Sequence, residues 1–332
     1  MSAKIQSTPW SAVCPARCLT RRRIVRYNRA PGCGTGRARA SRTAGSYGRT
    51  VARSDSVLLS GGQVATLEPD RWNGARVELV VDGTPQSSVN LSDPSDLAFE
   101  YVERIGHVID LIGEPRAPIT AVHFGAGALT IPRYVEWTRP GSRQQVVELE
   151  PELVDFVRER LPLPRGASIR IRYGDAREVA EKLPGGLQGA ADLVVVDVFA
   201  GATIPAPVTT VEFYRLAAGL LNDRGVLAVN VADGAGLPFA RGQMATIASV
   251  LPHVAVVAEA QVMKGRRFGN LVIVGTRDPG MLDWLPRLVA AGPHPAQAVS
   301  GEELEKVVRN APVVTDATAS PSPDPGRGIF SR

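Results

Sequence analysis

The chain has 332 residues, 44% of them hydrophobic and 21% charged, which is enough apolar material for a sizeable core in one large or two modest domains. The net charge of +5 is unevenly placed: residues 1–54 carry one lysine and eleven arginines without an acid, and the remaining residues carry 26 basic and 33 acidic side chains. No apolar run reaches the roughly 18 to 20 residues of a membrane span, and no secretory signal is visible, so we expect a cytoplasmic protein with no membrane partner.

Residues 1–54 have the composition of a basic tail. They are rich in Gly, Ser and Arg and lack hydrophobic periodicity, so we expect them to be disordered. Three other interpretations compete: attraction of nucleic acid by the arginines, an organelle transit peptide, or an extension upstream of the true start. Nucleic-acid binding carries less weight than a plain tail or extension, so we expect no nucleic-acid partner.

The cysteines and histidines give no sign of a metal site. All three cysteines, Cys14, Cys18 and Cys33, lie in the basic tail, where no His or Cys cluster completes a zinc site. The four histidines of the chain show no metal-ligand spacing either. We therefore predict that the protein binds no metal, and the cysteine-free remainder fits a reducing cytosol.

A small antiparallel β unit is expected over residues 55–92. Short alternating segments surround the pair Asp82 and Gly83, which is a strong hairpin-turn signal. Asp93 and Pro94 then have the form of an N-cap and a first-turn proline. Apolar residues at helical spacing follow, so a helix is predicted from there to about Ile112.

Residues 93–316 have the pattern of a doubly wound α/β domain. Five strand and helix segments alternate after Pro118, which requires a parallel sheet covered on both faces. The last two strands, "VAVVAEAQV" and "NLVIVGT", are separated by only seven residues and must pair antiparallel. We therefore predict a mainly parallel seven-stranded sheet ending in an antiparallel hairpin, the arrangement of S-adenosylmethionine-dependent transferases. Residues 317–332 have the composition of a flexible tail.

Special residues follow the first four parallel strands, at the edge where α/β proteins bind their ligands. The first strand ends in "FGAGA", in which Gly125 and Gly127 allow the backbone to pass close to a ligand, although such glycines are often only packing devices. The second ends near Glu148, about 20 residues further on, at the spacing where an acid binds ribose hydroxyls. The third ends at Asp175 and the fourth at Asp197.

Structural explanations compete with the functional ones for each acid. Glu150 and Glu152 fit the start of a helix at Pro151, but Glu148 fits that role poorly. Asp175 is suited either to accept from the exocyclic amine of an adenine or to cap the helix from Ala176. Asp197 is either a catalytic carboxylate or a partly buried acid satisfied by loop amides.

The stretch "DVFAGATIPAPVTTVEFY", followed by "LLNDRGVLAVNV", resembles the spermidine synthase-like family of polyamine aminopropyltransferases, in particular its divergent bacterial branch. The likeness covers about residues 56–280. The segment "VDGTPQSS" is also similar to the N-terminal domain of that family, where a glutamine matching Gln86 lies near the nucleoside. Members are often dimers or tetramers, so the resemblance allows a homodimer.

The resemblance implies aminopropyl transfer from decarboxylated S-adenosylmethionine to a small amine such as putrescine. Glu148 would bind the ribose and Asp175 the adenine, and Asp197 would lie beside the attacking amine. Asp197 would orient the protonated amine and accept its proton. The loop after it, with Gly201, would form a lid over the substrate.

The chain departs from the family pattern at three positions. Ala126 replaces an acid in the glycine-rich turn, Ala200 replaces a second acid beyond Asp197, and Ala98 stands where a tyrosine contacts the polyamine. Recognition of two or three ammonium charges is therefore weakened, because Asp197 is the carboxylate that clearly remains.

Two alternatives stay open from the sequence. One is a methyltransferase that uses intact S-adenosylmethionine, whose carboxylate would pair with Arg133, or with Arg266 and Arg267. The other is a nucleoside-binding protein without catalysis. His123, inside the first parallel strand, is expected to be a satisfied core histidine rather than a base. A nicotinamide-dependent oxidoreductase is disfavoured, because "GAGALT" lacks the third glycine of the dinucleotide fingerprint.

Overall fold

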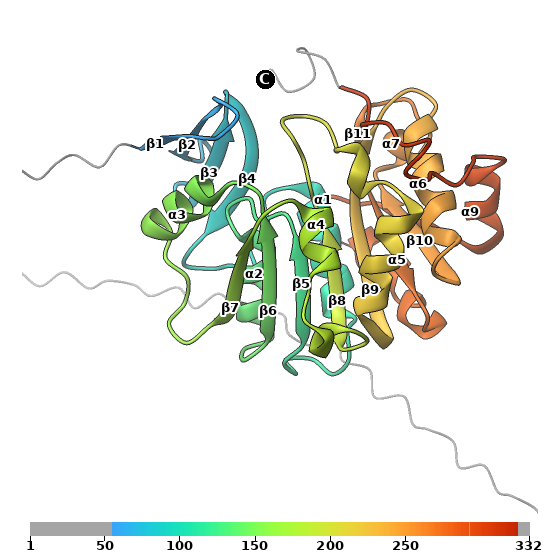
Figure 1. The fold of residues 1–332 in the computed structure, drawn as a ribbon, viewed down its shortest axis with the longest axis horizontal. Coiled ribbons are helices and arrows are strands. Elements are labelled where there is room, and N and C mark those ends of the chain that lie inside the picture. Colours follow the sequence, from blue (N-terminus) through green and yellow to red (C-terminus); the bar gives the residue numbers. More distant parts are fainter. Residues whose placement is uncertain (1–54, 292, 325–332) are drawn as a thin grey trace, which may run out of the picture. The chain divides into compact units, whose positions relative to one another are not determined.

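The computed structural model describes residues 55–291 and 293–324, so the predictions for residues 1–54 and for the end of the chain from 325 lie outside the described residues. The described chain contains two sheets (Figure 1). One has four antiparallel strands in the order β1-β2-β3-β4. The other has eight strands in the order β12-β10-β11-β9-β8-β5-β6-β7.

The small sheet is formed by β1 (Ser56–Leu58), β2 (Val64–Pro69), β3 (Arg76–Val81) and β4 (Thr84–Asn90). Its sharpest turn is at the predicted hairpin, where Asp82 and Gly83 have φ values of 47° and 78°. Two consecutive positive φ values are typical of the two-residue turn whose twist matches that of paired strands. The Asp82 carboxylate accepts a hydrogen bond from the backbone N–H of Val64 at 2.9 Å, which ties this turn to the start of β2.

The large sheet contains β5 (Thr120–Phe124), β6 (Arg143–Glu148), β7 (Ser168–Tyr173), β8 (Ala191–Val196), β9 (Leu221–Asp233), β10 (His253–Ala258), β11 (Gly269–Thr276) and β12 (Gln297–Ser300). The five strands β5 to β9 pair in parallel. β11 pairs antiparallel with β9 and β10, which confirms the predicted hairpin end of the sheet. The fold class predicted from the sequence is thus confirmed.

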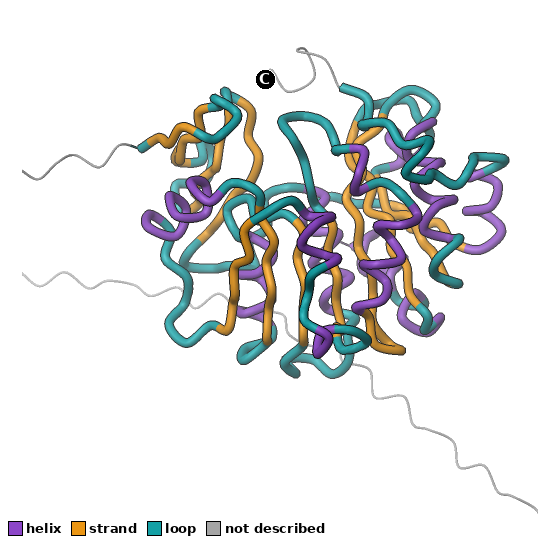
Figure 2. The backbone as a smooth tube through the Cα atoms, in the orientation of Figure 1, coloured by secondary structure: helices purple, strands orange, loops and turns teal. Residues whose placement is uncertain are grey.

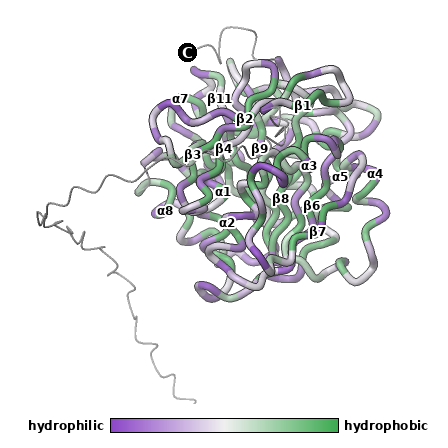
Figure 3. The backbone as a smooth tube through the Cα atoms, turned by 90° about the vertical axis from the view of Figure 1, so that its left-hand side faces the viewer, coloured by the Kyte–Doolittle hydropathy of each residue, from purple (hydrophilic) through white to green (hydrophobic). Residues whose placement is uncertain are grey.

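Helices cover both faces of the large sheet (Figure 2). They are α1 (Glu100–Asp110), α2 (Thr130–Thr138), α3 (Pro151–Arg160), α4 (Ala176–Glu181), α5 (Val211–Leu220), α6 (Pro238–Ala248), α7 (Ala260–Met263), α8 (Leu285–Ala291) and α9 (Gly301–Val308). One apolar core lies between the sheet and α4, α5, α6 and α9, and a second lies against α1, α2 and α8. Because the central strands are buried on both sides, they are almost wholly apolar, as Figure 3 shows for β8.

A third apolar cluster joins the small sheet to the large one. Leu79 and Val89 of the small sheet pack with Leu153 and Val157 of α3 and with Val146 of β6. The small sheet therefore lies beside the carboxyl ends of the parallel strands, where it forms one wall of the cavity described below.

The structure differs from the sequence-based expectation in three elements. An eighth strand, β12, extends the sheet beyond β10, with which it pairs antiparallel. The segment after β10 turns into the short helix α7 at Ala260 instead of continuing as a strand. α1 begins at Glu100, because Asp93 caps a local turn by accepting from the Ser95 backbone N–H at 3.1 Å rather than starting the helix.

Residues 311–324 form a strap across the carboxyl edge of the large sheet. The backbone of Val314 accepts from the Val211 N–H at 2.8 Å and donates to the Thr246 hydroxyl at 2.9 Å. Ser322 is buried and exchanges two hydrogen bonds with the Ile204 backbone, at 2.9 and 3.0 Å. The described residues 317–324, which composition assigned to a flexible tail, are therefore attached to the body of the domain.

The contact between Thr246 and the strap is testable. Thr246 is fully buried, donates to the Gly242 carbonyl at 2.6 Å and accepts from Val314. We expect Thr246→Val to lower the free energy of unfolding by about 1–3 kcal/mol, because the Val314 N–H loses its acceptor. Chemical denaturation measures this value. Ser320→Ala, at an exposed residue of the strap whose hydroxyl takes part in none of the hydrogen bonds among the described residues, is the control and should change it by less than about 0.5 kcal/mol. Equal effects of the two changes would contradict the assignment.

Candidate active site

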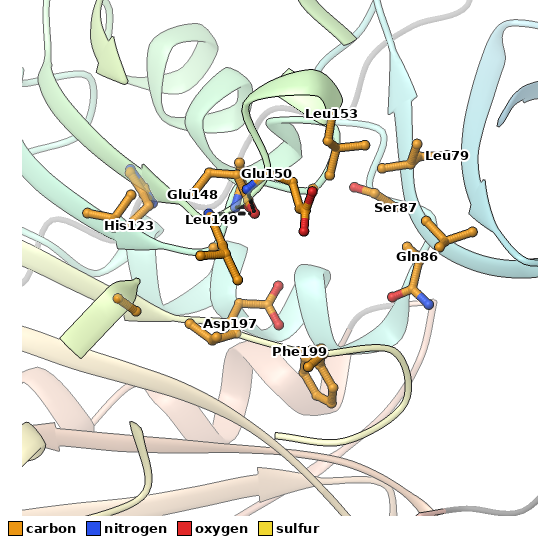
Figure 4. Close-up of a pocket in the computed structure, with 18 of the residues that line it drawn as sticks. Leu79, Gln86, Ser87, His123, Glu148, Leu149, Glu150, Leu153, Asp197 and Phe199 are labelled. Atoms are coloured by element: carbon orange, nitrogen blue, oxygen red, sulfur yellow. Dashed lines mark hydrogen bonds between the residues drawn. The ribbon is translucent and has the colours of Figure 1, made fainter. Parts of the chain in front are cut away.

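A cavity of about 240 Å³ lies beyond the carboxyl ends of β5, β6, β7 and β8 (Figure 4). The small sheet bounds it on one side, and the loop of residues 198–208 bounds it on another. All six residues predicted as site residues line this cavity: Gln86, Gly125, Gly127, Glu148, Asp175 and Asp197. The structure therefore brings together residues that are spread over more than a hundred positions of the chain.

Asp197 is the first residue after β8, and two side chains from other elements hold its carboxylate. Asn230 of β9 donates its Nδ2 to Asp197 Oδ1 at 2.8 Å, and the Tyr101 hydroxyl of α1 forms a second hydrogen bond to the carboxylate. Burial raises the pKa of Asp197 above its ordinary value, and these two hydrogen bonds only partly oppose it. Burial also raises the pKa of Tyr101, so its phenol stays protonated and donates.

Tyr101 and Asn230 were not predicted as site residues. The family pattern has its contacting tyrosine at the position of Ala98, whereas the tyrosine beside the Asp197 carboxylate in this structure is Tyr101, three residues later. Its place in the apolar stripe of α1 made it indistinguishable from a core residue in the sequence. Asn230 lies in the apolar, buried part of β9. A polar amide in such a strand is the one feature of the sequence that could have marked it as a site residue.

Gly125 makes possible the close approach of β5 to β8. A Cβ atom at this position would lie 2.0 Å from the Asp197 carbonyl oxygen, and the φ value of Gly125 is 95°. The backbone N–H of Asp197 donates to the Phe124 carbonyl at 2.9 Å, which holds the two strand ends in that contact. Gly127 faces Ser87 of the small sheet. A Cβ atom added at Gly127 would lie 3.2 Å from the Ser87 Oγ.

Glu148 is held by backbone amides at the end of β6. Its Oε2 accepts from the Ala126 N–H at 2.8 Å, and its Oε1 accepts from Leu149 at 2.8 Å and Glu150 at 3.1 Å. Burial raises the pKa of Glu148, with these amides acting in the opposite direction. The carboxylate is thus fixed across the glycine-rich turn, and one lone pair of Oε2 stays available to a ligand.

Glu150 has a structural partner from the small sheet. Its carboxylate accepts from the Ser60 backbone N–H at 2.9 Å and from the Ser60 hydroxyl at 2.5 Å. The residue also precedes α3 directly, as the sequence indicated. This pair fastens the loop after β1 to the rim of the cavity.

Asp175 caps α4, which is the structural role that the sequence left open. Its Oδ1 accepts from the backbone N–H groups of Arg177 at 2.9 Å and Glu178 at 3.1 Å. Its Oδ2 accepts no hydrogen bond from the described residues, and Asp175 also lines the cavity. Capping by one oxygen and ligand binding by the other are therefore compatible.

Gln86 and His123 lie on opposite sides of the cavity in the view of Figure 4. Gln86 extends from β4, and its amide takes part in none of the hydrogen bonds among the described residues. His123 is buried in β5 as expected, and its Nε2 pairs with Gln144 Oε1 at 3.0 Å. Burial lowers the pKa of His123 to about 4, so the ring is neutral at physiological pH.

The charged side chains that line the cavity in the described part of the chain are all acidic. Four carboxylates line it, at Glu148, Glu150, Asp175 and Asp197, whereas its described lining includes neither lysine nor arginine. An acidic cavity of this kind favours a cationic ligand.

The arginines considered for a ligand carboxylate have other roles. Arg133 is buried and donates to the carbonyls of Leu161 and Pro162, and Arg267 pairs with Glu259 at 3.1 Å. Arg266 is exposed and outside the cavity lining.

The described residues contain no group of three or more His, Cys, Asp or Glu side chains arranged to hold a metal ion. Within the same ranges, none of the helices combines the length and apolar character that crossing a membrane requires.

Comparison with known proteins places this architecture among transferases. No protein-family model matches the sequence. The crystal structure of a probable spermidine synthase from Corynebacterium glutamicum superposes with a TM-score of 0.71 and is 31% identical, over 79% of this chain and 95% of that one. An N-terminal histidine N-methyltransferase of Emericella nidulans is 29% identical over 243 residues, which are 69% of this chain and 42% of that protein.

A polyamine aminopropyltransferase of Neisseria meningitidis is 27% identical over 149 residues, which are 44% of this chain and 54% of that protein. The chain thus matches about half the length of these two curated relatives.

The contact at Gly125 predicts a strong effect of one methyl group. We expect Gly125→Ala to lower the free energy of unfolding by about 2–5 kcal/mol, because backbone strain and overpacking add at a site with no room for Cβ. Denaturation curves measure the loss. Gly127→Ala is the matched control: its φ of 50° also strains an alanine, but the nearest atom to the added Cβ is Ser87 Oγ at 3.2 Å rather than a backbone oxygen at 2.0 Å, so we expect a smaller cost. A Gly125→Ala protein as stable as Gly127→Ala would contradict this account.

The raised pKa of Asp197 predicts a pH-dependent stability difference. An aspartate ionises near pH 3.9 in the unfolded chain. Because the pKa of Asp197 is higher in the folded protein, ionisation of its carboxyl lowers the free energy of unfolding as the pH rises. Asp197→Asn removes that cost. The Tm of the variant relative to wild type should therefore increase between about pH 4 and pH 7, as differential scanning calorimetry would measure. A relative Tm that falls over this range would refute the stated direction.

Proposed function

Because this chain belongs to the spermidine synthase-like family, we propose that it is a transferase that moves the aminopropyl group of decarboxylated S-adenosylmethionine to a small amine. The two curated relatives described above are an aminopropyltransferase and a methyltransferase, which supports group transfer from a cosubstrate of the S-adenosylmethionine type.

The charge of the cavity is the observation that carries this choice. Intact S-adenosylmethionine has a carboxylate, which would have to be buried beside Glu148, Glu150, Asp175 and Asp197 without a cationic side chain in the described lining. The decarboxylated cosubstrate lacks that group and carries only positive charges. An acidic cavity therefore favours the decarboxylated form.

The strand-end residues supply contacts for the nucleoside part. The free lone pair of Glu148 Oε2 would accept from a ribose hydroxyl, and Asp175 Oδ2 would accept from the adenine amine. Gln86 would contact the nucleoside from the small sheet, since its amide has both a donor and an acceptor to offer. The turn at Gly125 and Gly127 brings the backbone close to this region.

Asp197 would act on the amine that attacks. The amine nitrogen forms a bond to the propyl carbon next to sulfur, the carbon–sulfur bond breaks, and sulfur keeps the electron pair as the thioether of 5′-methylthioadenosine. The Asp197 carboxylate accepts the proton that the amine loses. Tyr101 and Asn230 fix the carboxylate in position, and the sulfonium is already a good leaving group, so positioning accounts for much of the remaining barrier.

Methyl transfer from intact S-adenosylmethionine is the second candidate. Ala126 leaves the glycine-rich turn without the acid that would repel a ligand carboxylate, and a relative that covers 69% of this chain is a histidine N-methyltransferase. In that case a backbone N–H, rather than a cationic side chain of the described lining, would have to receive the carboxylate.

Cosubstrate choice separates the two candidates. We expect decarboxylated S-adenosylmethionine and 5′-methylthioadenosine to raise the Tm of the full chain more than S-adenosylmethionine and S-adenosylhomocysteine do. With an amine acceptor, mass spectrometry should detect an aminopropylated product. Asp197→Asn should lower kcat by about 10²–10⁴-fold, because the proton acceptor is lost, yet keep the shift caused by 5′-methylthioadenosine.

The opposite preference, with a methylated product, would support the second candidate. A nucleoside panel that leaves the Tm unchanged would refute both.

A further inference from the structure

The loop after Asp197 forms part of the cavity wall and is held in shape by short-range turns. Residues from 198–208 line the cavity, among them Phe199, which Figure 4 shows at the cavity wall. The Ala200 N–H donates to the Thr203 carbonyl at 2.8 Å, and the Thr203 N–H donates to the Ala200 carbonyl at 3.3 Å. Bonds of this kind shape the loop but do not attach it to the rest of the domain.

Ile204 attaches the loop to the end of the described chain. Its N–H donates to the Ser322 Oγ at 2.9 Å, and its carbonyl accepts from the Ser322 N–H at 3.0 Å. Both residues are buried, with exposed fractions of 5% for Ile204 and 4% for Ser322. Within the described ranges, no other group outside the loop forms a hydrogen bond with residues 198–204. The pair with Ser322 is therefore the hydrogen-bonded connection that holds this part of the loop in place.

The strap that carries Ser322 is attached separately, earlier in the chain. Val314 is bonded to α5 and α6, as described above. The Asp316 N–H donates to Glu212 Oε2 at 3.0 Å, and the Asp316 carboxylate accepts from Arg177 of α4 at 3.2 and 3.3 Å. These contacts lie six residues or more before Ser322, so they hold the strap whether or not its end is bonded to the loop.

Release of the loop from the strap requires little disruption elsewhere. It breaks the two hydrogen bonds between Ile204 and Ser322 and exposes the Ile204 side chain, while the sheets, the helices and the start of the strap keep their contacts. Segments with few attachments of this kind supply the mobile lids of binding sites. Phe199 and Gly201 line the cavity and precede Ile204 directly, so they would move with it.

We propose that residues 198–204 form a lid and that Ser322 is its latch. The cavity is closed while Ile204 is bonded to Ser322, and ligands enter and leave when this pair separates. Ser322 is not among the residues that line the cavity, so it is a positioning residue that acts through the loop. The inference holds for either candidate cosubstrate and does not depend on the proposed aminopropyl transfer.

Hydrogen exchange, measured by mass spectrometry on the full-length protein, tests the latch without a ligand. In Ser322→Ala the Ile204 N–H loses its acceptor, so we expect exchange in a peptide that spans residues 198–208 to become about tenfold faster, the effect of one hydrogen bond. A peptide from β9 should exchange at the wild-type rate, because the domain itself does not open more often.

Two further variants are the matched controls. Ser320→Ala changes an exposed serine of the same strap and should leave exchange of the lid unchanged. Thr246→Val loosens the strap at Val314 but keeps Ser322, so it should speed exchange near residues 311–316 and not over the lid. Exchange of the lid that stays at the wild-type rate in Ser322→Ala, or that rises equally in a control or together with β9, would overturn the inference.

The rates of ligand entry and release supply a second measurement, with 5′-methylthioadenosine as the probe and surface plasmon resonance as the method. Because the latch lies outside the cavity lining, Ser322→Ala should raise both rates about tenfold and change Kd by less than about threefold. A release rate equal to that of wild type would count against the latch even if the nucleoside binds. If the nucleoside does not bind wild-type protein but the exchange pattern is observed, the proposed function fails while the latch stands.

Discussion

The candidate site depends on strand ends that are joined directly through their backbones. One residue beyond three of the five parallel strands, an N–H donates to the neighbouring strand: Asp197 to Phe124, Gly125 to Val147, and Gly174 to Glu148, each at 2.9 Å. At Gly125 the approach is so close that no side chain fits. These bonds fix how far the end of each strand extends relative to its neighbour. The position of each acid therefore depends on backbone geometry rather than on a flexible loop.

The acids at these strand ends fall into two physical classes. Glu148 and Asp175 are held by backbone amides, which are rigid donors and leave part of each carboxylate free. Asp197 is held by side chains only, those of Tyr101 and Asn230, and burial raises its pKa. The first arrangement suits binding, because it costs no reorganisation. The second suits a group that must change its protonation state.

Much of this arrangement could be predicted from the sequence, and the remainder could not for physical reasons. Strand alternation and the rule that ligands bind beyond the carboxyl edge were sufficient to select Glu148, Asp175 and Asp197. Tyr101 and Asn230 could not be identified as site residues, because their contact with Asp197 depends on how α1 and β9 pack against β8, which local sequence does not encode. The strand β12 was not predicted, because four residues are too few to show a recognisable hydrophobic periodicity.

The two hydrogen bonds between Ser322 and Ile204 link the end of the described chain to the loop that closes the cavity. Ile204 lies seven residues after Asp197, and its partner is 118 residues later in the chain. During synthesis on the ribosome, the parallel strands and their acids can assemble well before that partner exists. The loop reaches its final hydrogen bonding only when residue 322 has emerged, so a nascent chain would have the acidic carboxyl edge of its sheet formed before the cavity there is fully enclosed.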